Sequence, residues 1–309
     1  MQYRLLSALP LLVLTSGCAA RRVPVQATVV DLSPKFLSFY DSAVAGRLDA
    51  EARWSLWKTR YGFAAVPPTP FGDSLARRLL DSAWTRYPDA LPRIRTGAAA
   101  LGISPERELH RVVGLLGCGS ETKVKVVVFV GGFEENAFAY SSADGTPTIA
   151  LPLEAGDASR SLLHELTHAV HRSSGCADIK SGYGQSLAEL VLSEGVAMRV
   201  VERLLPGHGA SYYTNAAPGW LDSATARRAA ILRGVREHLT ESGGAIAQKF
   251  TFGGGTTGLP REAYYAGWEI IGALLRGGMS LHDIATTRPD GIADLVLRGI
   301  QELEPESAR

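Results

Sequence analysis

The residues best suited to chemistry are 164–168, which read His-Glu-Leu-Thr-His. Two histidines four positions apart on a helix present their imidazoles on one face, where both can bind one Zn²⁺. A glutamate beside the first histidine can take a proton from a metal-bound water. We therefore expect His164 and His168 to be zinc ligands and Glu165 to be the general base of a hydrolytic reaction.

The elements around this motif must present it to a metal. The pattern predicts a helix over residues 157–173, with Asp157 as its N-cap. At about 100° per residue, Leu162, Leu166 and Ala169 share one face and the histidines point the other way. Such a helix can pack against a core on one side and hold a metal on the other.

A third histidine on the same helix, His171, is poorly placed as a ligand. It lies about 10 Å from His164 along the helix axis, at 1.5 Å per residue, so one ion cannot easily reach both side chains. We expect His171 instead to support the ligands or to line the cleft.

A glutamate on a later helix is a better third ligand. The predicted helix over residues 186–205 carries three glutamates, and Glu194 falls in the centre of its apolar face. Glu189 points to the opposite side and Glu202 lies at one flank. A carboxylate that faces a core needs a cation or a metal as partner. This position favours Glu194 as the third zinc ligand.

Two further segments resemble a known family. Residues 193–197 read Ser-Glu-Gly-Val-Ala, with Glu194 26 positions after His168, and residues 264–268 read Tyr-Tyr-Ala-Gly-Trp. Together with the histidine motif, they resemble gluzincin-type zinc peptidases, and most closely a bacterial family of predicted Zn-dependent proteases. The resemblance spans about residues 120–300 and implies a zincin-like fold that cleaves peptide bonds.

The resemblance also implies a tyrosine that stabilises the oxyanion of the reaction. Tyr264 occupies the matching position, and a tyrosine hydroxyl can donate a hydrogen bond to that charge. Three other tyrosines remain candidates from the sequence: Tyr265, Tyr212 and Tyr213.

The fold predicted from the sequence is of the α+β class, mainly helical, with a small sheet packed against the motif helix. Residues 33–116 form a helical N-terminal region, and residues 117–309 form the zincin-like domain. The sheet consists of a strand at 123–130 and a hairpin around Asp144-Gly145, formed by 138–142 and 146–153. The later helices are expected over these ranges: 186–205, 221–240, 261–276 and 290–303.

The first residues indicate export. A short apolar run at 5–14 follows Arg4, which is typical of a secretory signal and too short to span a membrane. Ser16-Gly17-Cys18 resembles the lipobox of bacterial lipoproteins. The resemblance implies a signal peptide over 1–17, acylation of Cys18, a tether over 18–32 and anchoring to a membrane of the cell envelope. A plain signal peptide is the alternative, and it also leads out of the cytoplasm.

Two cysteines remain after Cys18, namely Cys118 and Cys176. An exported compartment permits a disulfide, so we expect these two to be bridged near the end of the motif helix. Buried free thiols are the alternative.

The composition limits the partners. The chain has 32 basic and 31 acidic residues and no basic cluster, which argues against nucleic acid. We expect a peptide or protein substrate, which could extend the sheet by pairing with the strand at 146–153. Two other functions stay open: an envelope lipoprotein that binds a partner and uses zinc only structurally, and a zinc hydrolase acting on a non-peptide bond.

Overall fold

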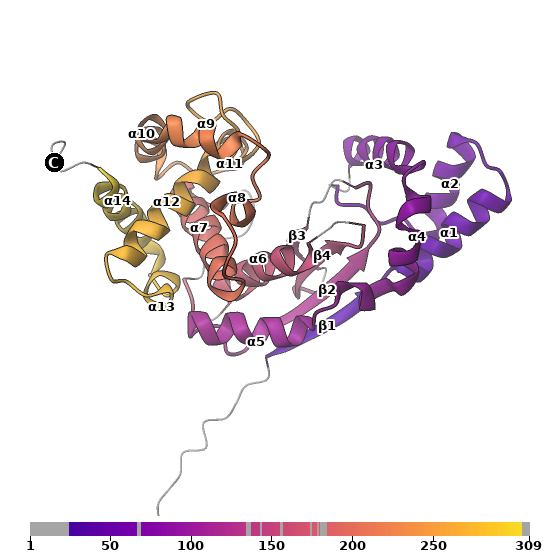
Figure 1. Cartoon of the computed structure of the whole chain (residues 1–309), viewed down its shortest axis with the longest axis horizontal. Helices are drawn as coiled ribbons and strands as arrows, with labels where there is room; N and C mark the ends of the chain where they lie inside the picture. The colour runs from indigo at the N-terminus through magenta and orange to yellow at the C-terminus, as the bar shows by residue number, and fades with distance from the viewer. Residues whose placement is uncertain are drawn as a thin grey trace, which may run out of the picture.

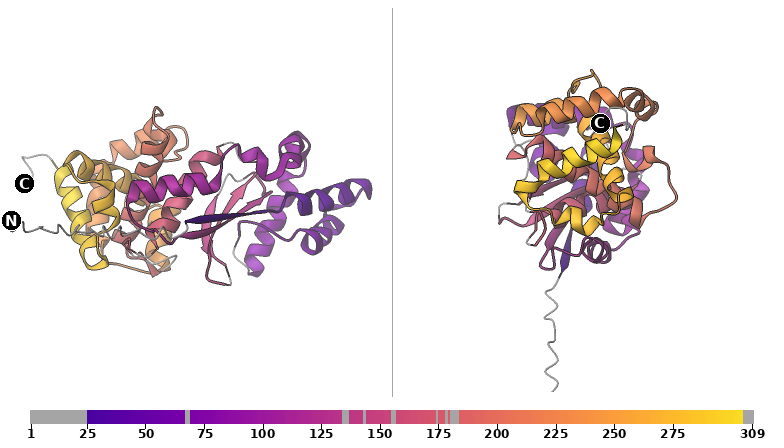
Figure 2. Two further views of the ribbon diagram at one scale, coloured as in Figure 1. Left: turned by 90° about the horizontal axis from the view of Figure 1, so that it is seen from below. Right: turned by 90° about the vertical axis from the view of Figure 1, so that its left-hand side faces the viewer.

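The protein is elongated, and its helices gather at the two ends of a small central sheet (Figures 1 and 2). The computed structural model describes the following residues: 25–66, 69–133, 137–142, 144–154, 157–173, 175–177, 179 and 184–304. Helices α1–α4 lie at one end, the strands with α5 and α6 lie in the middle, and α7–α14 lie at the other end (Figure 1). The predicted α+β class, mainly helical, is confirmed.

The N-terminal helices are built around aromatic side chains. Their bounds are α1 Ser33–Ala45, α2 Ala50–Arg60, α3 Pro70–Ala83 and α4 Tyr87–Thr96, followed by the 3₁₀ turn η1 Gly97–Leu101. Phe36 and Tyr87 are buried with their rings 4.9 Å apart, edge to face. The hydroxyls of Tyr61 and Tyr87 donate hydrogen bonds to the carbonyls of Val130 and Gly131, just beyond a central strand. These bonds tie the helical end to the sheet.

The sheet has four strands in the order β1-β2-β4-β3. Their bounds are β1 Gln26–Asp31, β2 Lys123–Phe129, β3 Phe138–Ser141 and β4 Pro147–Pro152. Strands β1, β2 and β4 are parallel, with Val29 opposite Val126 and Val126 opposite Ile149. The hairpin of β3 and β4 is antiparallel, with Phe138 opposite Ala150. The predicted strand and hairpin are therefore confirmed.

Two expectations about the sheet are wrong. Residues 26–31, which we placed in the tether, form β1 because their backbone pairs with β2. The strand expected to receive a substrate, at 146–153, contributes β4, which is bonded to β2 on one side and β3 on the other. Strand β4 has no free edge, and among the described residues the unpaired edge next to it belongs to β3. Residues 1–24, including the expected signal peptide and Cys18, lie outside the described residues.

Helix α5 Pro105–Leu116 contacts β1, helix α6 Ala158–His171 contacts β4, and the two helices contact each other along the sheet. The side chain of Asp157 accepts a hydrogen bond from the backbone N–H of Arg160, so the predicted cap of α6 is confirmed. Leu162 and Leu166 are fully buried. The apolar face of α6 therefore packs inward as expected, and its histidines face the C-terminal helices.

The C-terminal helices surround α7. They are α7 Leu187–Leu204, α8 Ala210–Tyr213, α9 Trp220–Ala226, α10 Arg228–His238, α11 Gly244–Thr251, α12 Glu262–Arg276, α13 Leu281–Ala285 and α14 Ile292–Leu303, with a 3₁₀ turn η3 Pro289–Gly291. The helix expected over 221–240 is two helices that meet at Arg227. In the part of the chain that the structure describes, no helix has the length and hydrophobicity needed to cross a membrane.

Candidate metal centre

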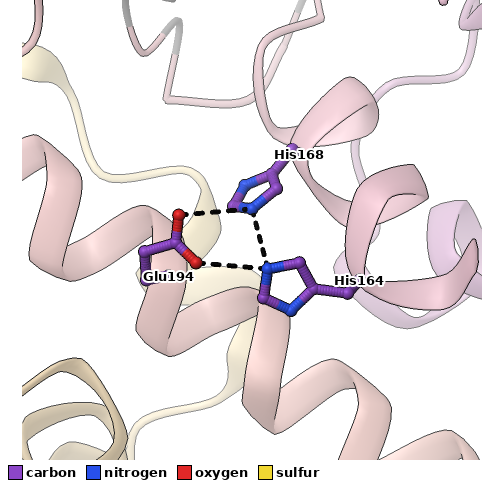
Figure 3. Close-up of side chains that lie close together, drawn as sticks. All are labelled: His164, His168 and Glu194. Carbon is purple, nitrogen blue, oxygen red and sulfur yellow. Dashed lines mark hydrogen bonds and ion pairs between the residues drawn. The ribbon is translucent and has the colours of Figure 1, made fainter. Parts of the chain in front are cut away.

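Two histidines from α6 and one glutamate from α7 converge on one point (Figure 3). The Nε2 atoms of His164 and His168 lie 3.0 Å apart. One Glu194 carboxylate oxygen lies 3.1 Å from His164 Nε2, and the other lies 3.6 Å from His168 Nε2. Ligand atoms at about 2.0–2.1 Å from a tetrahedral zinc ion are about 3.3 Å from one another. The nitrogen and oxygen donors thus have the chemistry and the spacing of a zinc site.

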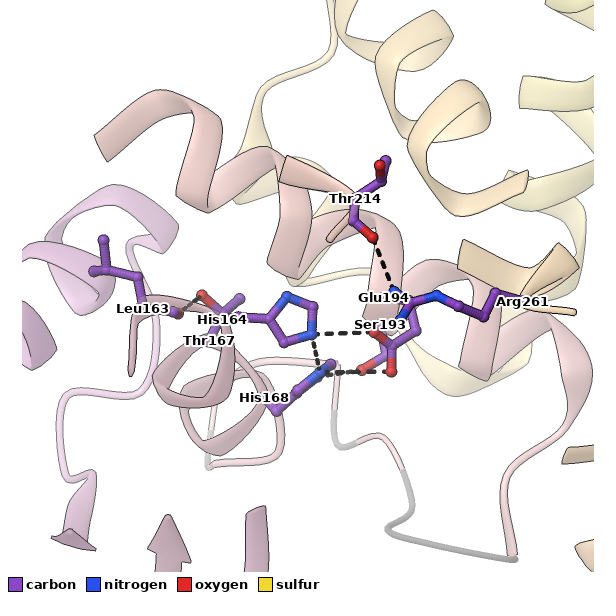
Figure 4. Close-up of polar contacts among 8 residues, drawn as sticks. All are labelled: Leu163, His164, Thr167, His168, Ser193, Glu194, Thr214 and Arg261. Atoms are coloured by element: carbon purple, nitrogen blue, oxygen red, sulfur yellow. Dashed lines mark hydrogen bonds and ion pairs between the residues drawn. The ribbon is translucent and has the colours of Figure 1, made fainter. Parts of the chain in front are cut away.

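Ser193 fixes the orientation of one ligand. Its hydroxyl lies 2.9 Å from His168 Nδ1 (Figure 4). If Nδ1 donates its proton to Ser193, the lone pair of Nε2 is left facing Glu194 and the centre of the site. Ser193 is therefore an orienting partner of His168, a role that the sequence did not indicate.

The charges of the three ligands stabilise each other. Burial alone would raise the pKa of Glu194, but the charges and hydrogen bonds of His168 and His164 outweigh it and lower that pKa. Burial would lower the pKa of His164, and the Glu194 carboxylate raises it instead. The Glu194 side chain is only 10% exposed, and its carboxylate is held here by the two imidazoles that face it.

Glu165, the glutamate of the His-Glu-Leu-Thr-His motif, lies at a pocket beside the metal centre. Glu165 lines this pocket together with His164, Tyr264 and two arginines, Arg160 and Arg261. Burial raises the pKa of Glu165, while His168 and His164 act in the opposite direction. Glu165 is not part of the three-ligand cluster, so its carboxylate is left to face whatever enters the pocket.

Of the four candidate tyrosines, only two line the pocket, Tyr264 and Tyr213. The Tyr213 hydroxyl is already engaged, since it donates a hydrogen bond to the carbonyl of Leu205. The Tyr212 hydroxyl donates to Asp157 on α6, and Tyr265 is buried with its ring against Trp220. The Tyr264 hydroxyl also has a hydrogen bond, to the metal-ligand candidate Glu194, which places it next to the ligands in the pocket. Tyr264 is therefore the candidate oxyanion donor.

The environment of Tyr264 keeps its hydroxyl protonated. Burial raises the pKa of Tyr264, and the nearby charge of Glu194 raises it further. A phenol that remains protonated can donate a hydrogen bond at neutral pH.

A close contact between α7 and α12 brings Tyr264 to the ligands. A Cβ atom on Gly195 would lie 2.5 Å from the carbonyl oxygen of Gly267, and one on Gly267 would lie 2.6 Å from the carbonyl of Val191. The two backbones can approach this closely only because both residues are glycines. Glu194 precedes one glycine, and Tyr264 lies one turn before the other. This contact explains physically why glycines accompany Glu194 and Tyr264 in the two sequence segments.

Several pocket residues were not identified from the sequence. Arg160 is the third residue of α6, Arg261 directly precedes α12, and Thr214 and Asn215 follow α8. The guanidinium of Arg261 donates a hydrogen bond to the carbonyl of Thr214, 2.9 Å away (Figure 4). No local pattern marks these residues, because they meet only after α8 and α12 have packed around α6.

Of the two roles expected for His171, the one at the cleft wall is wrong. The side chain is fully buried and does not line the pocket. Burial lowers the pKa of His171 to about 3. His171 is thus a neutral, buried residue outside the pocket lining.

Cys118 and Cys176 form a disulfide. Cys118 follows the end of α5, and Cys176 follows the end of α6. The bridge therefore ties the C-terminal ends of two adjacent helices, one of which carries the metal ligands.

Comparison with known proteins agrees with the geometry. Residues 135–293 match the model of a family described as Predicted Zn-dependent protease (DUF2268). The chain therefore belongs to this family, and the match covers all three candidate ligands. No curated protein and no solved structure matches the chain.

Proposed function

We propose that the protein is a zinc-dependent peptidase of the bacterial cell envelope. The observation that carries this proposal is the three-ligand cluster of His164, His168 and Glu194, with Glu165 beside it in an accessible pocket. A purely structural zinc site needs no general base next to its ligands. The family description supports the same activity.

In this proposal, the residues of the pocket have separate roles in peptide hydrolysis. Bound Zn²⁺ would lower the pKa of a water molecule toward about 7. Glu165 accepts the proton of the attacking water and delivers it to the leaving amine. The protonated hydroxyl of Tyr264 donates a hydrogen bond to the oxyanion that forms on the peptide carbonyl.

The sheet supplies a surface for an extended peptide. Strand β3 lies at the edge of the sheet, and Ala137, directly before it, lines the pocket. The free backbone groups of an edge strand can pair with a peptide. We propose β3, rather than β4, as the strand that positions the substrate.

The proposed location in the cell envelope rests on the N-terminal residues. The apolar run at 5–14 and the Ser16-Gly17-Cys18 segment support export, acylation of Cys18 and anchoring to a membrane of the envelope. Metabolic labelling with a palmitate analogue tests this point, and loss of the label in Cys18→Ser is the expected result.

The activity is tested by incubating zinc-loaded protein with a broad peptide library, with and without a chelator. We expect cleavage that the chelator stops and that added zinc restores. Glu165→Gln should lower kcat by about 10²- to 10⁴-fold while the protein still binds zinc, because it removes the proton acceptor and no ligand.

Glu202→Gln on α7 is the matched control and should cleave normally. Wild-type zinc-loaded protein that cleaves no peptide would contradict the proposal. In that case, screening the same protein for hydrolysis of non-peptide amides and esters, and for partner binding, would separate the two alternative functions.

A further inference from the structure

The pocket beside the metal centre contains two guanidinium groups that form no ion pair among the described residues, although the charge of Arg160 acts on the carboxylate of Asp157. Arg160 comes from α6 and Arg261 directly precedes α12, and both line the pocket. Within the described ranges, neither side chain forms an ion pair, and Glu165 is the only carboxylate in the lining. Partly buried cations without a direct ion pair are costly, so a ligand that brings a negative charge is favoured.

Each guanidinium is held in place by contacts that use few of its donors. The Arg160 Nη1 atom lies 3.3 Å from the carbonyl of Tyr212, and its guanidinium lies over the Tyr212 ring. Arg261 donates to the carbonyl of Thr214, and its guanidinium is 4.1 Å from the centre of the Tyr264 ring. The Nε atom of Arg261 is buried and has no hydrogen-bond partner among the described residues. A guanidinium has five N–H donors, so both groups keep donors for a ligand.

The backbone at this pocket is strained. Among the described residues, four that are not glycine have a positive φ, and two of these, Asn215 at +48° and Arg261 at +66°, line the pocket. Asparagine tolerates this conformation, but arginine adopts it at a cost of about 1 kcal/mol. Strain of this kind persists where surrounding contacts enforce it, and it gathers at ligand sites.

The contact that enforces the conformation of Arg261 comes from the next residue. Glu262 is fully buried, and its carboxylate accepts four hydrogen bonds from the backbone and hydroxyl groups of Thr256 and Thr257. This network holds the loop before α12 against the start of the helix. The guanidinium of Arg261 is thereby held at the pocket before any ligand arrives.

We infer that Arg160, Arg261 and Asn215 form a subsite for a carboxylate group of the substrate. This inference rests on the proposed function, in that a peptide must occupy the pocket. The carboxylate is either the side chain of an aspartate or glutamate near the cleaved bond or the C-terminal carboxylate of a short peptide. Arginine binds carboxylates through paired N–H donors, and both arginines keep donors for such a group.

Binding is measured with zinc-loaded Glu165→Gln protein, which should hold peptides without cleaving them. Calorimetric titrations compare short peptides that differ by one group: aspartate or glutamate against asparagine or glutamine, and a free C-terminus against a C-terminal amide. We expect the carboxylate of one of these pairs to tighten binding by about 10-fold or more, which identifies its source. Equal affinities within both pairs would overturn the inference.

Arginine variants in the same background test the assignment. Arg160→Gln and Arg261→Gln should each remove most of the carboxylate advantage, whereas Arg78→Gln, an exposed residue of α3, should leave it unchanged. A merely structural role of either arginine would weaken carboxylate and amide peptides equally, which would contradict the subsite. Arg160→Gln keeps the test valid if Arg261→Gln does not fold.

Cleavage of the same peptides by the wild-type protein separates the two proposals. Cleavage without preference for either carboxylate overturns the subsite and leaves the peptidase standing. Carboxylate-dependent binding without any cleavage supports the subsite and overturns the peptidase.

Discussion

The N-terminal region and the metal centre differ in whether their buried or half-buried arginines form ion pairs. In the helices α1–α4, Arg53 is buried, pairs with Asp81 at 2.7 Å and lies over the ring of Trp84. At the metal centre, Arg160 and Arg261 line a pocket without an ion pair among the described residues. Arg53 therefore has a paired carboxylate within the fold, although its Nε atom has no hydrogen-bond partner among the described residues, whereas Arg160 and Arg261 have no such ion pair.

The two regions also differ in how their elements pack together. The N-terminal helices enclose the ring of Phe36 among other aromatic rings. The site depends on a glycine contact between α7 and α12 and on two non-glycine residues at positive φ. The N-terminal region also has a non-glycine residue at positive φ, Arg47 between α1 and α2, so the site is distinguished by the glycine contact and by its arginines without ion pairs. Substitutions in the two regions should separate stability from activity.

The largest effect is expected at Glu194. Glu194→Ala removes one of three ligands, so we expect zinc affinity to fall by more than 100-fold and peptide cleavage to disappear. Metal content after dialysis against a weak chelator measures the change. Glu202→Ala, on the same helix and outside the cluster, is the control and should keep its zinc. Full zinc occupancy in Glu194→Ala would refute the ligand assignment.

The disulfide should make the next largest contribution. It closes a loop between residues 58 positions apart, which corresponds to about 4 kcal/mol in the chain-entropy treatment. We expect the double variant Cys118→Ser and Cys176→Ser to lose about this much free energy of unfolding in urea titrations. Unchanged stability, or two freely alkylated thiols in unreduced wild-type protein, would argue against the bridge.

The glycine contact is tested by Gly195→Ala. The added methyl group would meet the carbonyl of Gly267, so we expect a loss of about 1–3 kcal/mol in unfolding free energy. Because Glu194 and Tyr264 depend on this contact, cleavage should fall as well. Gly114→Ala is the matched control, since its added methyl meets no atom within 4 Å, and it should stabilise the protein slightly. Equal behaviour of the two variants would remove the role assigned to the contact.

The smallest effect is expected in the N-terminal region. Arg53→Leu breaks an ion pair whose Asp81 side chain is 37% exposed, so we expect a loss of about 1 kcal/mol in stability. Urea titration measures this change, and kcat/KM for a cleaved peptide should stay at the wild-type value. A marked drop in kcat/KM would show that the two regions are coupled. It would contradict the expectation that substitutions in the N-terminal region change stability alone.

Local patterns in the sequence predicted the elements that carry the ligands. Helix α6 and its cap at Asp157 follow from a 3.6-residue period and a capping residue, and the hairpin follows from Asp144-Gly145. Glu194 could be chosen over Glu189 because a carboxylate in the middle of an apolar face needs a reason to be buried. The structure places it 3.1 Å from His164.

Features that depend on distant contacts were missed or wrong. Strand β1 could not be predicted, because a short strand whose residues are mostly exposed or half-buried is stabilised by pairing with β2, almost a hundred residues later. The order of the strands, which gives the open edge to β3 rather than β4, is likewise set by pairing and not by periodicity. His171 was expected at the cleft, but its side of α6 is covered in the folded protein.

The sequence by itself determined which groups could bind a metal: two imidazoles one helical turn apart, and a glutamate on an apolar face. The spacing of side chains along a helix is a local property, so it can be read without the fold. Only the tertiary structure decided that these atoms meet at about 3 Å, that Tyr264 lies beside Glu194 in the pocket, and that Arg160 and Arg261 share this pocket. These contacts depend on how closely α7, α8 and α12 pack around α6. The packing of separate helices cannot be predicted from any one segment of the sequence.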